Sequence, residues 1–211
     1  MNWKIIGASI AILSGFSLAF MAQNHKILNV KIEQLNPEIQ TILQNRIVYI
    51  DAAELLDTIH NNDIRLRLFD VRDEVSYNLF HILDAQRVTF DLLKSSLWIK
   101  NNIPNQTVIV LMSNDESLAT QAWKLLFVQS IDHIYILEGG INNWLSLYHT
   151  NDISLDKRIN HIDESLNYLF RAALGGNHPA SNPDIHDQTP RKYLKKIKPI
   201  GNSSKKSGGC G

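Results

Sequence analysis

The chain has almost no cysteine: the single one, Cys210, stands one residue from the end of the 211-residue sequence. An intramolecular disulfide is therefore impossible, which excludes a fold that depends on disulfide bonds. A lone thiol favours either pairing with another molecule or a reactive role. Cys210 lies in no C-terminal CaaX motif, and no cysteine follows the N-terminal apolar run, where a lipobox cysteine would stand.

Net charge is absent as well. The 21 basic residues balance the 21 acidic ones. This balance implies no general attraction to nucleic acid, so no nucleic-acid partner is expected. Basic residues gather only near the end, where the segment from Arg191 to Lys206 holds seven of them and no acidic residue. We interpret this local charge as a solvated or membrane-surface segment.

Charge is also missing from the run between Ile5 and Ala22, which is mostly apolar. A helix of that length spans roughly 27 Å, close to the hydrocarbon thickness of a bilayer. The lack of a clean A-x-A cleavage site favours a signal anchor over residues 1–24, with residues 5–22 in the membrane. The alternative is a cleaved signal peptide, after which the protein would be secreted. In both cases we expect the globular part on the extracytoplasmic, periplasmic side.

Residues 25–45 are predicted to form a connector helix. Asn36 has the character of an N-cap, because a proline and a glutamate follow it at the positions that favour helix initiation. Further along, Asp51 and Glu54 have the spacing of a capping box, which predicts the start of another helix.

Strand-like and helix-like stretches then alternate. Strands are predicted at 47–50, 65–69, 88–90, 108–112 and 133–137, with helices between them, including one at 92–99 capped by Asp91 and one at 141–149. Such alternation is typical of an α/β fold with a mostly parallel central sheet flanked by helices.

One strand–loop–helix unit is the most informative part of the sequence. Apolar residues fill positions 108–112, polar residues fill 113–117, and a helical pattern follows. At the C-terminal end of a parallel strand, such a loop opens a helix N-terminus whose backbone N–H groups can hold an anion. The side chain where the strand ends, Met112, therefore decides the chemistry of a site there.

Two groups of residues flank this unit. They are, in order, Asp70, Arg72, Tyr77, His81, Ile82 and Ala85 upstream, and Leu137, Gly139, Gly140 and Trp144 downstream. In order and spacing they resemble the rhodanese, or sulfurtransferase, domain family. That family pairs D-x-R, an aromatic and H-I-x-G-A with a later L-x-G-G-x-x-x-W. The resemblance runs from about Val48 to Leu147 and predicts a single rhodanese-like domain at residues 46–149.

The resemblance implies a reactive cysteine, the carrier of a persulfide, at the position of Met112. The loop here consists of Met112, Ser113, Asn114, Asp115, Glu116 and Ser117. A thioether has no acidic proton, so it can neither become a thiolate nor carry a persulfide. The two carboxylates would repel an incoming thiosulfate, and Phe80 and Asp84 replace two further glycines of the family pattern. We therefore expect a rhodanese fold with no catalytic residue in this loop, no cofactor and no metal.

Six motif residues are expected to be structural: Asp70, Arg72, His81, Gly139, Gly140 and Trp144. The charged pair would brace the strand end, and the histidine would be packed or hydrogen-bonded. The glycines would allow a positive φ or a close backbone approach, and the tryptophan would lie in the core. We interpret Asp115 and Glu116 as a solvated first turn of the following helix.

Two segments complete the predicted organisation. Residues 150–176 are predicted to be a packed helical extension, because apolar residues recur near one helical face between Leu155 and Leu174. Residues 177–211 are predicted to be a flexible basic tail without a core of its own. No tight metal-ligand spacing occurs among the polar residues of this tail, which are His178, Asp184, His186, Asp187 and Cys210.

The sequence favours a membrane-tethered rhodanese-like domain that lacks the usual nucleophile and acts as a binding or scaffold module in sulfur or redox metabolism. A protein partner, not identified by the sequence, would contact the loop. The alternative is a sulfurtransferase or sulfur carrier in which the tail delivers the thiol of Cys210 to the loop. Outside that alternative, the chain is not expected to be an enzyme.

Overall fold

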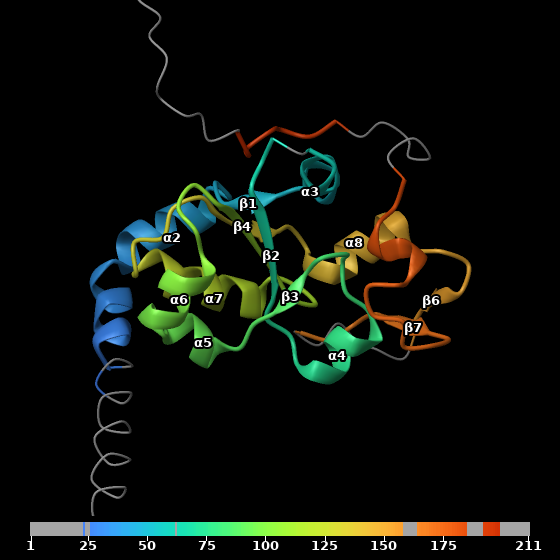
Figure 1. Cartoon of the computed structure of the whole chain (residues 1–211), viewed down its shortest axis with the longest axis horizontal. Coiled ribbons are helices and arrows are strands. Elements are labelled where there is room, and N and C mark those ends of the chain that lie inside the picture. Colours follow the sequence, from blue (N-terminus) through green and yellow to red (C-terminus); the bar gives the residue numbers. More distant parts are fainter. Residues whose placement is uncertain (1–22, 24–25, 62, 158–163, 185–191, 199–211) are drawn as a thin grey trace, which may run out of the picture.

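The computed structural model describes residues 23, 26–61, 63–157, 164–184 and 192–198 (Figure 1). The apolar run at 5–22, the last residues of the basic tail and Cys210 lie outside these ranges. In the part of the chain that is described, no helix is both long enough and apolar enough to cross a bilayer.

A five-stranded parallel sheet forms the centre of the molecule (Figure 1). Its spatial order is β1-β5-β4-β2-β3, and its strands are Tyr49–Ile50 (β1), Leu66–Asp70 (β2), Gln86–Arg87 (β3), Val108–Met112 (β4) and Ile134–Leu137 (β5). The central strand β4 is buried along its whole length, as expected for a parallel sheet that is covered on both faces. The predicted α/β fold with a mostly parallel sheet is confirmed.

Helices cover both faces of the sheet. One apolar layer joins the sheet to α2 (Asn36–Gln44), α5 (Phe90–Lys94), α6 (Ser96–Asn102) and α7 (Ser117–Phe127). The other joins it to α3 (Ala52–Ile59) and α8 (Gly140–Tyr148). A short helix, α4 (Glu74–Leu79), follows the carboxyl end of β2 and has no buried residue.

The helix starts differ in part from the sequence prediction. Asp51 caps α3, and its side chain accepts a hydrogen bond from the N–H of Ala53 at 2.8 Å. Glu54 does not complete a capping box: its buried carboxylate accepts the backbone N–H groups of Lys196 and Ile197, at 2.5 and 2.6 Å. Asn36 is the first residue of α2 and not its N-cap, because residues 26–34 are already helical and lead directly into α2.

The region around residue 90 also differs. The predicted strand at 88–90 is displaced to Gln86–Arg87. Thr89, and not Asp91, caps the next helix, and the predicted helix at 92–99 is divided into α5 and α6. The division occurs because the Ser95 hydroxyl accepts the N–H of Trp98 and starts a new helix there.

The prediction of a helix between Leu155 and Leu174 is wrong for the described residues. Two strands, β6 (Ile153–Leu155) and β7 (Tyr168–Phe170), pair there in antiparallel register. The side chain of Phe170 stacks on buried Phe80, with ring centroids 5.5 Å apart, while its neighbour Leu169 is exposed. This alternation has the period of a strand, and apolar residues spaced along a helical face conceal it in the sequence.

The tail after residue 176 is not wholly without a core. Within its described parts, a 3₁₀ turn at Pro179–Ser181 is buried, and Ile197 is completely buried against the α3 side of the sheet. The hydroxyl of Ser181 donates to the carbonyl of His81, which fixes the turn to the loop after α4. These two parts of the tail therefore belong to the folded domain.

Candidate functional site

Met112 ends the central strand, directly opposite Asp70 of β2. Its side chain is fully buried, in the same apolar cluster as Phe80 and Trp144. A buried thioether contributes packing and has no proton to lose, so this position cannot supply a thiolate.

The loop after Met112 is fastened to the start of α8. The carbonyl oxygens of Ser113 and Asn114 accept the backbone N–H groups of Ile141 and Asn142, at 2.9 and 3.0 Å. The Ser113 hydroxyl accepts the N–H of Ala119 at 3.1 Å, so it also holds the first turn of α7. The loop is therefore a fixed element between two helix N-termini.

Gly139 and Gly140 make this close packing possible. Both have positive φ, +67° and +59°. A Cβ atom on Gly140 would lie 2.2 Å from the carbonyl oxygen of Asp115, a distance that no side chain can occupy. Glycine is therefore needed at position 140 for conformation and for space.

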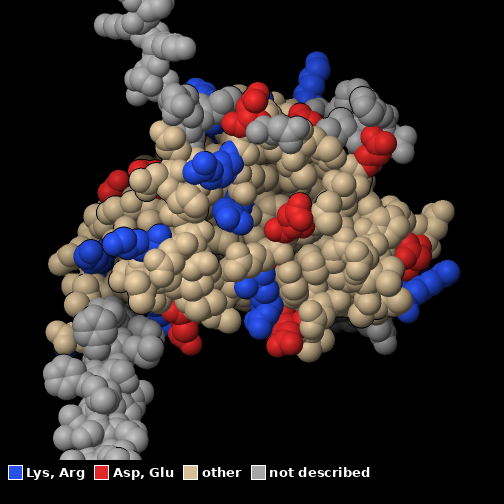
Figure 2. All heavy atoms as spheres, in the orientation of Figure 1, with Lys and Arg blue, Asp and Glu red and all other residues tan. Residues whose placement is uncertain are grey.

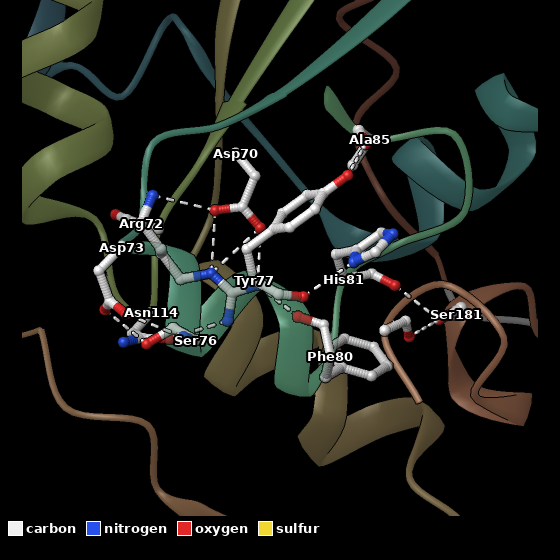
Figure 3. A network of polar contacts seen from close by, with 12 residues as sticks. Asp70, Arg72, Asp73, Ser76, Tyr77, Phe80, His81, Ala85, Asn114 and Ser181 are labelled. Carbon is white, nitrogen blue, oxygen red and sulfur yellow. Dashed lines mark hydrogen bonds and ion pairs between the residues drawn. The ribbon is translucent and has the colours of Figure 1, made fainter. Parts of the chain in front are cut away.

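A buried ion pair joins the loop to the end of β2 (Figure 3). The guanidinium of Arg72 lies 2.6 Å from a carboxylate oxygen of Asp70, and both side chains are essentially inaccessible to solvent. The same guanidinium donates to the carbonyl of Phe80 at 2.6 Å and to the side-chain oxygen of Asn114 at 3.1 Å. Arg72 thus connects β2, the end of α4 and the loop, and it is fully engaged with protein groups.

His81 packs against its neighbours and does not face the loop after β4. Its ring stacks on Tyr77 with a centroid distance of 3.9 Å, and its Nδ1 lies 2.8 Å from the Tyr77 carbonyl (Figure 3). Gly175 and Gly176 approach the other parts of the ring closely. Asp84, which stands in place of a family glycine, has a φ of +61°. It therefore keeps a left-handed conformation that aspartate tolerates better than most residues.

The interpretation of Asp115 and Glu116 as a solvated first turn is wrong, because both carboxylates are bonded within the protein. Glu116 forms a two-point contact with the guanidinium of Arg46, at 2.7 and 2.9 Å, and also accepts the N–H of Gly139 at 2.7 Å. The hydrogen bond from Glu116 holds the pKa of Arg46 above its usual range. Glu116 therefore ties the loop to the residues that precede β1.

Asp115 accepts hydrogen bonds from its own helix and from a distant segment. Its two carboxylate oxygens receive the N–H of Ser117 at 2.7 Å and the N–H of Glu164 at 2.9 Å. Burial alone would raise the pKa of Asp115, but the hydrogen bonds from Glu164 and Ser117 lower it to about 2. This carboxylate is therefore ionised at neutral pH.

Glu164 is the site residue that the sequence did not indicate. Its carboxylate accepts the N–H of Leu118, in the first turn of α7, at 2.7 Å. Burial, and then the neighbouring Asp115, raise the pKa of Glu164 to about 7. It lies 46 residues after Leu118, in a stretch predicted as helix, and nothing in the local sequence marks it.

The arrangement therefore offers no sulfur nucleophile and little room for an anion. The N-terminal end of α7, where an anion would be expected, is already in contact with the carboxylates of Asp115 and Glu164. Among the described residues, no group of three or more His, Cys, Asp or Glu side chains could hold a metal ion. His178 pairs with Asp152 at 3.0 Å, while His186, Asp187 and Cys210 lie outside the described ranges.

Comparison with known proteins agrees with the predicted fold. Residues 51–147 match the family model of the rhodanese-like domain. This part of the chain is therefore a rhodanese-like domain, as the motifs predict. No match was found among curated proteins.

Solved structures with the same fold include three from different microorganisms. The rhodanese-like domain of an Anabaena protein is 24% identical over 47% of this chain and 74% of its own, with a TM-score of 0.42. A Bacillus halodurans protein is 22% identical over 53% and 80% of the two chains, with a TM-score of 0.41. A rhodanese-related protein from Thermoplasma volcanium is 19% identical over 46% and 90%, with a TM-score of 0.40.

The buried pair predicts an asymmetric response to two arginine substitutions. Arg72→Met leaves the carboxylate of Asp70 buried and unpaired, so we expect the free energy of unfolding to fall by about 3–5 kcal/mol. Arg87→Met is the matched control, because Arg87 faces the largely exposed Glu74 at 3.5 Å. Its expected loss is below about 1 kcal/mol. Urea denaturation of both variants measures the difference, and equal losses would contradict the central role of Arg72.

Proposed function

We propose that the protein is a catalytically silent rhodanese-like binding module, tethered to a membrane through residues 5–22 and active in sulfur or redox metabolism. The observation that carries this proposal is a buried thioether at the end of β4, beside a loop whose anion-binding end is filled by the chain's own carboxylates.

The chemistry of sulfur transfer supports the absence of turnover. A sulfane sulfur is accepted by a nucleophile that can ionise, and a thioether cannot. The Ser113 hydroxyl donates to the Asp115 carbonyl and accepts the N–H of Ala119, so it is occupied with holding the loop. No other group in the loop offers a thiol.

The electrostatics of the loop also oppose an anionic donor. Asp115 is ionised at neutral pH and lies at the helix end that a thiosulfate would approach. Like charges at such short range disfavour binding by more than a surface ion pair gains. A silent domain with this loop is therefore better suited to contact a protein than to bind a small dianion.

Surface features support a protein partner over a nucleic acid. On the face shown in Figure 2, basic and acidic side chains are interspersed. Val75 is 80% exposed on α4, whose N-cap, Asp73, directly follows Arg72. An exposed apolar side chain beside the site is a suitable contact for a partner.

The membrane tether rests on the uncharged run at 5–22, which has the length of a bilayer-spanning helix. The body of the protein would then lie on the extracytoplasmic side. N-terminal sequencing of the mature protein distinguishes this anchor, which keeps Met1, from a signal peptide cleaved after about residue 22.

The second candidate function is sulfur transfer through the thiol of Cys210. It is favoured by one observation, the coincidence of a thiol-free loop with a lone cysteine on a basic tail. In this case the wild-type protein would form a persulfide on Cys210, and Cys210→Ser would abolish it.

We expect the full-length protein to form thiocyanate from thiosulfate and cyanide no faster than buffer alone. Met112→Cys supplies a thiol, but the carboxylate of Glu164 still contacts the N–H of Leu118. Transfer by Met112→Cys/Glu164→Ala should therefore exceed that by Met112→Cys about tenfold or more, because an anion donor is freed. Wild-type turnover that survives Cys210→Ser would contradict the proposal, and turnover lost in that variant would favour the alternative.

Partner binding is expected to depend on the side of the domain that carries α4. Tagged wild-type protein isolated from membranes should retain a partner that Val75→Asp loses. Leu97→Asp is the matched control, because Leu97 is also largely exposed but lies on α6, which packs against α5 (Figure 1). Equal retention by both variants, or no protein above background for the wild type, would count against this binding face.

A further inference from the structure

Residues 164–167 cross the loop after β4, and we call this segment the strap. Its first residue, Glu164, is bonded to the loop and to α7 on three sides. The backbone N–H donates to Asp115 at 2.9 Å, and the carbonyl accepts the side-chain amide of Asn114 at 2.8 Å. The side-chain carboxylate accepts the N–H of Leu118 at 2.7 Å.

The other end of the strap is held by α8. The side chain of Asn142 donates to the carbonyl of Ser165 and accepts the N–H of Asn167, both at 2.8 Å. The strap therefore bridges the first turns of α7 and α8, which are the two helix starts that border the loop. Polar groups of the loop that would otherwise face a ligand are satisfied by the chain itself.

The conformation of Glu164 shows that these contacts determine its position. Its φ is +62°, in the left-handed region that side chains larger than Asn or Asp adopt only at a steric cost. Such a conformation persists where surrounding interactions impose it. Without the hydrogen bonds to Asp115, Asn114 and Leu118, this residue would relax to another conformation.

The charges that face Glu164 oppose its ionisation more than they favour it. From the loop comes the carboxylate of Asp115, and from α7 comes the N–H of Leu118 with the positive end of the helix. The guanidinium of Arg72 contacts Asn114 and is paired with Asp70. One carboxylate oxygen of Glu164 is buried without a hydrogen-bond partner among the described residues.

We propose that residues 164–167 form a pH-dependent strap that closes the loop after β4 and must leave before the loop can receive a ligand. This inference rests on the proposed function, because it explains how a binding loop that is filled in the structure becomes available to a partner.

The direction of the pH dependence follows from the two carboxylates. The pKa of Glu164 is raised from 4.5 to about 7 in the closed strap, so protonation favours closure. The contribution is complete below about pH 4.5 and is lost as pH rises through about 7. The pKa of Asp115 is lowered from 3.8 to about 2, so its contribution is constant above about pH 4. Between about pH 5.5 and 8.5, the strap therefore loosens as pH rises.

Amide hydrogen exchange of the full chain tests this inference. The reporters are the peptides that contain Leu118 and Glu164, with rates divided by the intrinsic rate at each pH. A shift of one pKa unit corresponds to tenfold. Because Glu164 is only half-buried, we expect protection in the wild type to fall between about threefold and thirtyfold from about pH 5.5 to 8.5.

Two variants isolate the charge of Glu164. Glu164→Gln keeps an oxygen that accepts the N–H of Leu118 and cannot ionise, so protection should be nearly equal at both pH values. Glu38→Gln, on the exposed surface of α2, is the matched control and should behave as wild type. Glu164→Ala removes the acceptor and should exchange rapidly throughout.

Equal corrected rates for the wild type at both pH values would overturn the strap, as would an unchanged pH dependence in Glu164→Gln. Full protection in Glu164→Ala would overturn it as well. These outcomes leave the proposed function standing, because they do not concern sulfur transfer. Conversely, wild-type sulfur transfer independent of Cys210, together with pH-dependent exchange, would overturn the proposed function and leave the strap.

Discussion

The buried contact between Arg72 and Asp70 is the constraint on which the rest of the site depends. Two charges removed from water are stable only when every remaining donor and acceptor has a partner. Arg72 meets this requirement with the Phe80 carbonyl and the Asn114 side chain. Asn114 in turn donates to the carbonyl of Glu164. A chain of contacts therefore runs from the end of β2, through the loop, to a residue about fifty positions downstream.

The loop after β4 keeps the architecture of an anion site while its groups bind one another. Its carbonyls are bonded to the start of α8, and Gly140 allows the close approach. At the start of α7, carboxylates of the chain accept N–H groups that could otherwise bind an external anion. With a thioether at the strand end, the same geometry supports a rigid surface, whereas sulfur chemistry would require a group that can ionise.

The sequence predicts what depends on local pattern and misses what depends on distant contacts. Apolar runs located β4 and β5, and the paired glycines marked a backbone approach that only Gly140 can provide. The partner of Glu54 could not be predicted, because Lys196 lies 142 residues away. Glu164 was missed for the same reason. The pairing of β6 with β7 was missed because apolar residues in that segment fit a helical period as well as an alternating one.

The most direct test of a silent loop is the intact mass of Cys210→Ser after incubation with a polysulfide donor at about pH 8. With the only thiol removed, the account predicts an unmodified protein, because neither Met112 nor any other loop side chain can hold a sulfane sulfur. A sulfur adduct on this variant that a reductant removes would contradict the account.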